Sequence, residues 1–186
     1  MSEAQLWALG PGKGQKDKFV APKEPREVAQ AKAYTTHDGL PMVPGEVLMA
    51  ALIAAGQYVK LDGKRQMSTA KATLLPGFLS LEDAYLPLLH PKTGKPATWE
   101  VDMRQGRNPN GGEAVCLIRP RYDEWCFEAT CELDTQQLSE KVFRELFDLA
   151  GSRCGIGDFR PQRKGIFGRF KVGCWEALEE RQLAAE

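Results

Sequence analysis

The chain has 186 residues, of which 42% are hydrophobic and 27% charged, an ordinary composition for a globular protein. Its 25 basic and 25 acidic residues balance, so the net charge identifies no partner. The longest apolar run, "VLMAALIAAG", is shorter than the roughly 18 residues of a membrane span, and the N-terminus lacks the order of a signal peptide. We therefore expect a cytoplasmic protein without membrane contact: one domain over residues 1–175 and an acidic C-terminal tail over 176–186.

The cysteines predict neither a disulfide framework nor a zinc site. Their number, five, is odd, and no C-x-x-C pair occurs. We expect buried free thiols in a reducing compartment, and neither a metal nor another cofactor. The cysteines are Cys116, Cys126, Cys131, Cys154 and Cys174.

The N-terminal region predicts a short strand over residues 5–9 and a long basic loop over 10–26. Glycine, proline and lysine dominate this loop, "GPGKGQKDKFVAPKEPR". A loop of such length is usually functional or disordered, and composition does not separate these two interpretations. If it is functional, its lysines are candidate contacts to phosphate: Lys13, Lys16 and Lys18.

A first helix is predicted after Pro44, because proline is tolerated at a helix start and Glu46 suits the first turn. Residues 47–55 are apolar on nearly every side, so this helix should be buried. A second helix is predicted over residues 138–151. Ser139 is its expected N-cap and Gly151 the glycine expected just after its end.

Strands are predicted over residues 65–75 and 98–106, two more within 114–133, and a last one over 165–176. The alternation of apolar and polar residues over 125–133 is typical of a half-buried strand. The order of elements predicts an α+β fold. The expected arrangement is a ferredoxin-like (RRM-like) β-α-β-β-α-β domain with an inserted β-hairpin region and the long basic N-terminal loop.

The segment after the second helix, "GIGDFRPQRKGIFGRFKV" (155–172), combines glycine, cations and phenylalanine. Between residues 151 and 173 the chain has six basic residues and one acidic residue, Asp158. Glycine permits close backbone approach, arginine and lysine pair with phosphates, and exposed phenylalanines stack on bases. The segment therefore predicts a contact to single-stranded nucleic acid. The alternative is structural, with glycines closing a turn, a phenylalanine filling the core and solvated arginines.

This segment, together with "MVPGEVLMAAL" at the first helix, resembles the RAMP superfamily of CRISPR-associated proteins. In that superfamily, ferredoxin-like domains end in a glycine-rich loop before the last strand. In its backbone subunits, a Pro-Gly turn often introduces the first helix. The chain departs from the pattern where "EVLMAAL" replaces the usual serine- and lysine-containing continuation.

The resemblance implies a non-enzymatic protein that binds RNA or single-stranded DNA along its backbone, with RNA preferred. It also implies self-association or assembly with other subunits of a ribonucleoprotein. A phage- or plasmid-borne relative that coats single strands would share these features. The loop residues implied by the resemblance are Gly155, Gly157, Arg160, Gly165, Gly168 and Arg169. Charge alone adds Arg163 and Lys164.

Two other functions remain open from the sequence. Enzymes of the same superfamily are metal-independent endoribonucleases, and His37 lies just upstream of the first helix with Tyr34 nearby. An imidazole can take the proton of a 2′-hydroxyl near neutral pH, although "TTHDGLP" also suits an ordinary polar turn. The third possibility is a protein-interaction module, such as an inhibitor that mimics a CRISPR subunit and has no affinity for nucleic acid.

Overall fold

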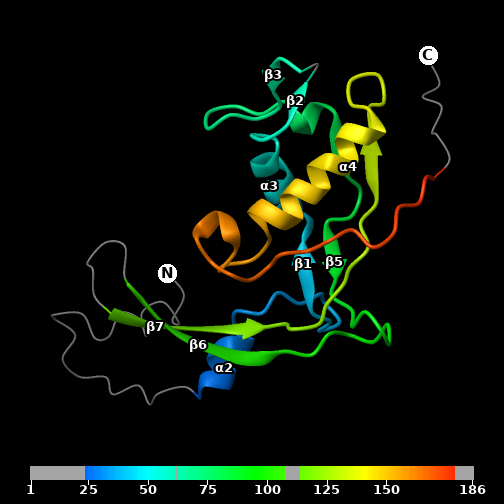
Figure 1. The fold of residues 1–186 in the computed structure, drawn as a ribbon. Helices are drawn as coiled ribbons and strands as arrows, with labels where there is room; N and C mark the ends of the chain where they lie inside the picture. The colour runs from blue at the N-terminus through cyan, green and yellow to red at the C-terminus, as the bar shows by residue number, and fades with distance from the viewer. Residues whose placement is uncertain (1–23, 62, 108–113, 179–186) are drawn as a thin grey trace. The chain divides into compact units, whose positions relative to one another are not determined.

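The computed structural model describes residues 24–61, 63–107 and 114–178. They form a mixed α+β structure with small antiparallel sheets, each of two strands among the described residues (Figure 1). The chain divides into two compact units, Met1–Val43 with Tyr85–Glu128 and Pro44–Ala84 with Ala129–Glu186. Single-domain organisation over residues 1–175 stays a prediction. The strand predicted over residues 5–9 and the candidates Lys13, Lys16 and Lys18 lie outside the described residues.

The first unit is built around a β-hairpin. Strands β6 (Glu100–Arg107) and β7 (Ala114–Arg121) pair antiparallel, from Glu100 opposite Arg121 to Arg107 opposite Ala114. This confirms the strand predicted over 98–106 and the first of the two within 114–133. Helix α2 (Pro25–Gln30) packs on the hairpin. The unit also holds the pair formed by β1 (Met42–Pro44) and β5 (Tyr85–Pro87).

Two contacts join the α2 region to the hairpin region. The Arg26 guanidinium lies over the ring of Trp99, 4.8 Å from its centroid. Just after α2, the Lys32 ammonium donates to the Ile118 carbonyl at 3.2 Å. Both cations are therefore engaged within this unit.

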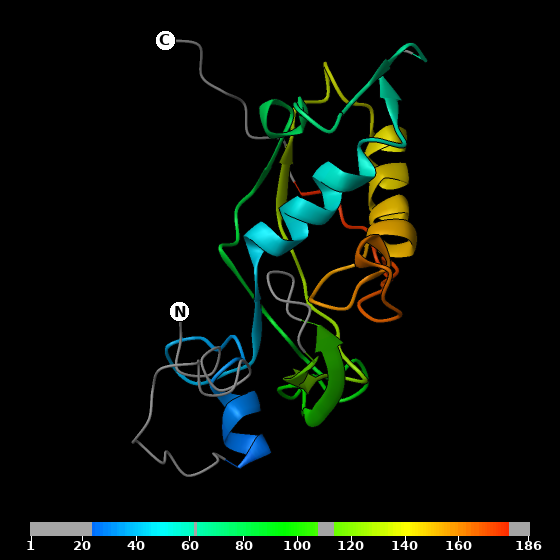
Figure 2. The ribbon, with the colours of Figure 1, turned by 90° about the vertical axis from the view of Figure 1, so that its left-hand side faces the viewer.

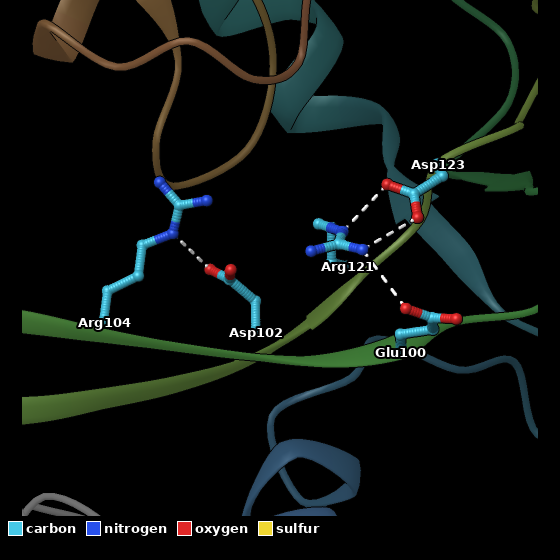
Figure 3. A network of polar contacts seen from close by, with 5 residues as sticks. All are labelled: Glu100, Asp102, Arg104, Arg121 and Asp123. Atoms are coloured by element: carbon cyan, nitrogen blue, oxygen red, sulfur yellow. Dashed lines mark hydrogen bonds and ion pairs between the residues drawn. The ribbon is translucent and has the colours of Figure 1, made fainter.

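Arginines of the hairpin are paired with nearby carboxylates (Figure 3). Arg121 binds Asp123 at 2.8 and 3.0 Å and reaches Glu100 at 3.2 Å. On β6, Arg104 binds Asp102 at 2.6 Å. The pairs of Arg121 are exposed and contribute little to stability, whereas the Arg104–Asp102 pair is half-buried. Their main consequence is that much of the positive charge of the hairpin is compensated locally.

In the second unit, helix α3 (Gly45–Ala55) confirms the predicted first helix. Pro44 is its N-cap residue, with an extended ψ of 136°, and Glu46 lies in the first turn. Leu48 and Leu52 are fully buried. A Cβ on Gly45 would lie 2.5 Å from the Asp83 carbonyl oxygen, and its N–H donates to the Ala84 carbonyl at 2.8 Å. The Pro-Gly entry therefore fits a close approach of the 83–84 backbone.

Helix α4 (Glu140–Leu149) confirms the second predicted helix, and the hydroxyl of Ser139 accepts from the Val142 N–H at 3.4 Å. Gly151 lies just past the end of α4, as predicted, but it does not end the helical path of the chain. The chain continues through a π-helical turn, η2 (Ala150–Cys154), and the positive φ of 71° occurs at Gly155. Gly151 serves a different purpose, because a Cβ there would overlap the backbone carbonyl of Phe170.

The long strand predicted over 65–75 is wrong. Only β3 (Arg65–Gln66) forms, paired with β2 (Lys60–Leu61). The chain then turns at Thr69, whose hydroxyl accepts from the Ala72 N–H at 3.1 Å, and Ser68 bridges back to Thr73.

The remaining short elements of this unit are the helical turn η1 (Leu75–Gly77) and the antiparallel pair β4 (Leu79–Leu81) and β8 (Cys131–Leu133). The strand expected over 125–133 is thus reduced to three residues. Helices α3 and α4 pack against each other (Figure 2).

The last strand, predicted over 165–176, does not form, and residues 165–178 have no regular structure. Side-chain packing holds this segment on α4. The Trp175 ring lies edge-on to Phe143 and Phe147, 5.3 Å from each centroid, and the Arg144 guanidinium lies over it at 5.0 Å. Aromatic contacts therefore replace the predicted sheet pairing.

The cysteines are free thiols, but they are not all buried. Cys154 is buried, Cys126 and Cys131 are half-buried, and Cys116 and Cys174 are exposed. Burial raises the pKa of Cys131 to about 11. None of the described helices has the length and apolar character needed to cross a membrane.

Candidate nucleic-acid interface

The glycine-rich loop, residues 155–168, leaves η2 and folds back on itself. The Ile156 N–H donates to the Gly168 carbonyl at 2.9 Å, and the Phe167 N–H donates to the Phe159 carbonyl at 2.9 Å. At the far end lies a short helical turn, η3 (Pro161–Arg163), which packs on η2. The two arms of the loop are therefore tied together by backbone hydrogen bonds.

Most of the loop glycines are required by this internal packing. A Cβ on Gly168, whose φ is +70°, would overlap the Ile156 carbonyl, and a Cβ on Gly165 would overlap the backbone of Phe159. A Cβ on Gly155 would lie 2.7 Å from Cδ of Pro161. These glycines allow one arm of the loop to approach the other, which is the structural interpretation of the pattern.

Gly157 differs from them. Its φ is +83°, but nothing lies within 4 Å of the position a Cβ would occupy. It is exposed. Of the candidate glycines, this one has open space where a side chain would begin, although its carbonyl accepts from Arg160.

The cations of the loop, together with Arg169 directly after it, also fall into two groups. Arg160 donates to the Gly157 carbonyl at 2.8 Å and to the Gln162 side chain at 3.3 Å, and Arg169 donates to the Ser152 carbonyl at 3.0 Å. These two arginines brace the loop. Arg163 and Lys164 are exposed, and neither forms an ion pair with any residue that the structure describes. We call Arg163 and Lys164 the tip pair.

Lys164 has a left-handed backbone, with a φ of 63°, and it is the only described residue other than glycine with a positive φ. Its N–H donates to the Pro161 carbonyl at 2.8 Å and thereby closes η3. The tip pair therefore lies at the end of the helical turn η3.

Apolar side chains lie beside the tip pair in the sequence. Phe159 is 41% exposed and lies edge-on to Phe167, with centroids 6.1 Å apart. Ile166 is 70% exposed, whereas Phe170 is half-buried. The loop therefore presents both positive charge and apolar surface to solvent.

The thiol nearest the loop is Cys154, which is buried at the end of η2. Burial raises its pKa, and the positive charges of Arg160 and Arg153 oppose that shift without reversing it. The thiol is therefore protonated at neutral pH and is not poised as a nucleophile. No group of three or more His, Cys, Asp or Glu side chains suited to a metal ion occurs among the residues that can be described.

His37 lies in an exposed turn of the first unit, closed by hydrogen bonds between Thr36 and Leu40. Its side chain is fully exposed, and its Nδ1 lies 3.7 Å from a carboxylate oxygen of Asp38. Tyr34 is 60% exposed. Within the described ranges, Asp38 alone lies within ion-pair distance of His37, and this geometry is that of a polar turn residue.

A second group of exposed cations and an aromatic ring was missed by the sequence analysis. It lies in "YVKLDGKR" (58–65), between α3 and β3. Tyr58 is 53% exposed, and the Arg153 guanidinium lies 5.0 Å from its ring centroid. The density of lysine and arginine around a tyrosine was the available signal, but the pairing with Arg153 spans 95 positions and only the fold reveals it.

Comparisons with known proteins identify no family for this chain. It matches no protein-family model, and no curated protein is significantly similar to it in sequence.

Proposed function

We propose that this chain is a non-enzymatic protein that binds single-stranded nucleic acid, RNA in preference to DNA, through its glycine-rich loop. One observation carries the proposal: the loop holds the tip pair, Arg163 and Lys164, exposed and without an acidic partner among the described residues, on a braced backbone. Unpaired cations are available to phosphates, whereas the hairpin arginines Arg104 and Arg121 already bind carboxylates.

Single strands suit this loop better than a duplex. Phe159 is exposed next to the basic turn, and a base stacked on an aromatic ring contributes about 1–3 kcal/mol. Bases in a duplex are already stacked on each other and do not offer a free face. The open backbone of Gly157 adds a position at which a strand can approach closely.

The ferredoxin-like arrangement and the RAMP relationship belong to the same proposal. The Pro44–Gly45 entry to α3 and the glycine-rich loop that follows α4 through η2 support them, whereas the strand expected after the loop does not form in residues 165–178. In such a protein, copies of the chain or other ribonucleoprotein subunits would lie side by side along the bound strand. The bound strand would be the ligand, and no metal or cofactor takes part in this scheme.

Fluorescence anisotropy tests the proposal with labelled single-stranded RNA, single-stranded DNA and duplex DNA over a series of salt concentrations. We expect the single strands to bind more tightly than the duplex, RNA best, with an affinity that falls steeply as salt rises. Absence of binding at about 50 mM salt, where contacts to phosphate are strong, would contradict the proposal.

A protein partner is the second candidate, and Ile166 is the observation that favours it. An isoleucine that is 70% exposed beside the 41% exposed Phe159 is the apolar surface that a protein interface buries. This candidate predicts no nucleic-acid affinity and a stable complex with another protein. The same anisotropy experiment therefore separates the two candidates.

A further inference from the structure

Tyr58 and Arg153 form a cation–π pair on the surface of the second unit. The guanidinium lies 5.0 Å from the ring centroid, Arg153 is exposed, and the tyrosine is 53% exposed. Among the described residues, no aromatic ring packs on Tyr58. The pair therefore leaves much of an ordered aromatic ring in contact with solvent.

The β2–β3 hairpin that follows Tyr58 is basic. Lys60 and Arg65 lie on the two paired strands, and Lys64 lies in the turn, whose N–H donates to the Leu61 carbonyl at 3.0 Å. All three side chains are exposed, and none forms an ion pair with another described residue. Like the tip pair, and unlike Arg104 and Arg121, these cations bind no carboxylate among the described residues.

Arg153 connects this surface to the glycine-rich loop. It belongs to η2, which packs on both α3 and η3. Gly155, the first residue of the loop, follows two positions later. One short turn of the chain thus supplies the guanidinium on Tyr58 and the start of the loop that carries the tip pair.

We propose that Tyr58, held by Arg153, is a base-stacking platform for single-stranded nucleic acid, and that Lys60, Lys64 and Arg65 bind the adjacent phosphates. The inference rests on the proposed function and extends it to a second contact with the same strand. A guanidinium over a tyrosine fixes the ring, and a fixed, exposed ring is what base stacking requires. Alternating aromatic and cationic side chains is the arrangement by which proteins hold single strands without reading sequence.

The test compares two exposed tyrosines in the full chain. Tyr58→Leu removes the ring beneath Arg153, Tyr58→Phe keeps it, and Tyr34→Leu is the matched control, since Tyr34 is 60% exposed in the other unit. Each variant is titrated with a single-stranded RNA and with an abasic strand of the same phosphate number. Thermal unfolding monitored by circular dichroism verifies that each variant is folded.

We expect Tyr58→Leu to weaken binding of the base-bearing strand by about 5- to 150-fold, the range of one lost stack. Binding of the abasic strand should not change, and Tyr58→Phe and Tyr34→Leu should resemble the wild type. The double change Lys60→Gln with Lys64→Gln should instead weaken binding of both the base-bearing and the abasic strand. It should also reduce the salt dependence of the affinity.

Three results would overturn the inference, and they are distinguishable from one another. If the wild type binds single strands but Tyr58→Leu behaves like Tyr34→Leu, the platform does not exist and the proposed function survives. Equal loss for base-bearing and abasic strands also rejects stacking. If the wild type binds no single strand at all, the proposed function fails and the platform fails with it.

Discussion

Gly157 and Gly168 have similar backbone conformations and opposite surroundings. Both have a positive φ, 83° and 70°, but only Gly157 has open space where a side chain would begin. At Gly168 that space is occupied by the Ile156 carbonyl. The two arms cannot separate to make room without losing the hydrogen bond from the Ile156 N–H to the Gly168 carbonyl. Gly157 is therefore required only by its backbone conformation, whereas Gly168 is required both by its conformation and by close packing.

We expect Gly168→Ala to destabilise the protein substantially more than Gly157→Ala. Alanine in the left-handed region costs about 1–2 kcal/mol at either position. At Gly168 the overlap with Ile156 adds a packing cost, typically about 1–3 kcal/mol. Urea unfolding of both variants measures the difference directly. Equal destabilisation would contradict the assignment of Gly168 to loop closure.

At this scale the sequence predicted residue types better than residue roles. The cations of the loop were recognisable, but nothing in "FRPQRKG" distinguishes the bracing Arg160 from the exposed Arg163. That distinction depends on whether a carbonyl such as that of Gly157 lies within reach, which only the folded backbone decides. Likewise, the role of Arg153 requires Tyr58, which is distant in the sequence.

At the start of helix α3, the backbone of Gly45 packs closely against the backbone of residues 83–84. The Gly45 N–H binds the Ala84 carbonyl at 2.8 Å, and the Asp83 carbonyl lies 2.5 Å from where a Cβ would be placed. Asp83 is held in turn, because its carboxylate accepts from the Thr130 N–H at 2.8 Å. The neighbouring backbone therefore cannot move away without losing hydrogen bonds.

We predict that Gly45→Ala destabilises the protein by about 1–3 kcal/mol, although alanine is a better helix former than glycine. The control is Gly77→Ala, since no atom lies within 4 Å of a Cβ placed at Gly77 and its φ is not positive. Thermal unfolding compares the two. An unchanged or raised melting temperature for Gly45→Ala would contradict the packing account.

The elements predicted well are those with strong local signals. Helix α3 has a proline start and a long apolar run, α4 has a serine N-cap and an apolar stripe, and both were placed within a few residues. The strands over 65–75 and 165–176 were wrong for two physical reasons. A threonine turn at Thr69 interrupts the first, and aromatic packing of Trp175 on α4 takes the place of sheet pairing in the second.

The net charge of the whole molecule is zero, but its basic side chains are not all paired with carboxylates. Carboxylates bind Arg104 and Arg121 of the β6–β7 hairpin, whereas the tip pair has no acidic partner among the described residues. The net charge therefore gives no sign of the tip pair, on which the proposed function depends. Sequence counting located the basic segment around residues 151–173, and the structure identified which of its cations are available.

The measurement that tests this account most directly is the salt dependence of single-stranded RNA binding for Arg163→Gln with Lys164→Gln. The control is Lys71→Gln with Lys141→Gln, an equal change of charge at exposed lysines elsewhere in the second unit. If the tip pair binds two phosphates, the slope of log affinity against log salt should become shallower by about 1.4, while the control keeps the wild-type slope. Equal slopes for the two double variants would show that the loop does not hold the strand.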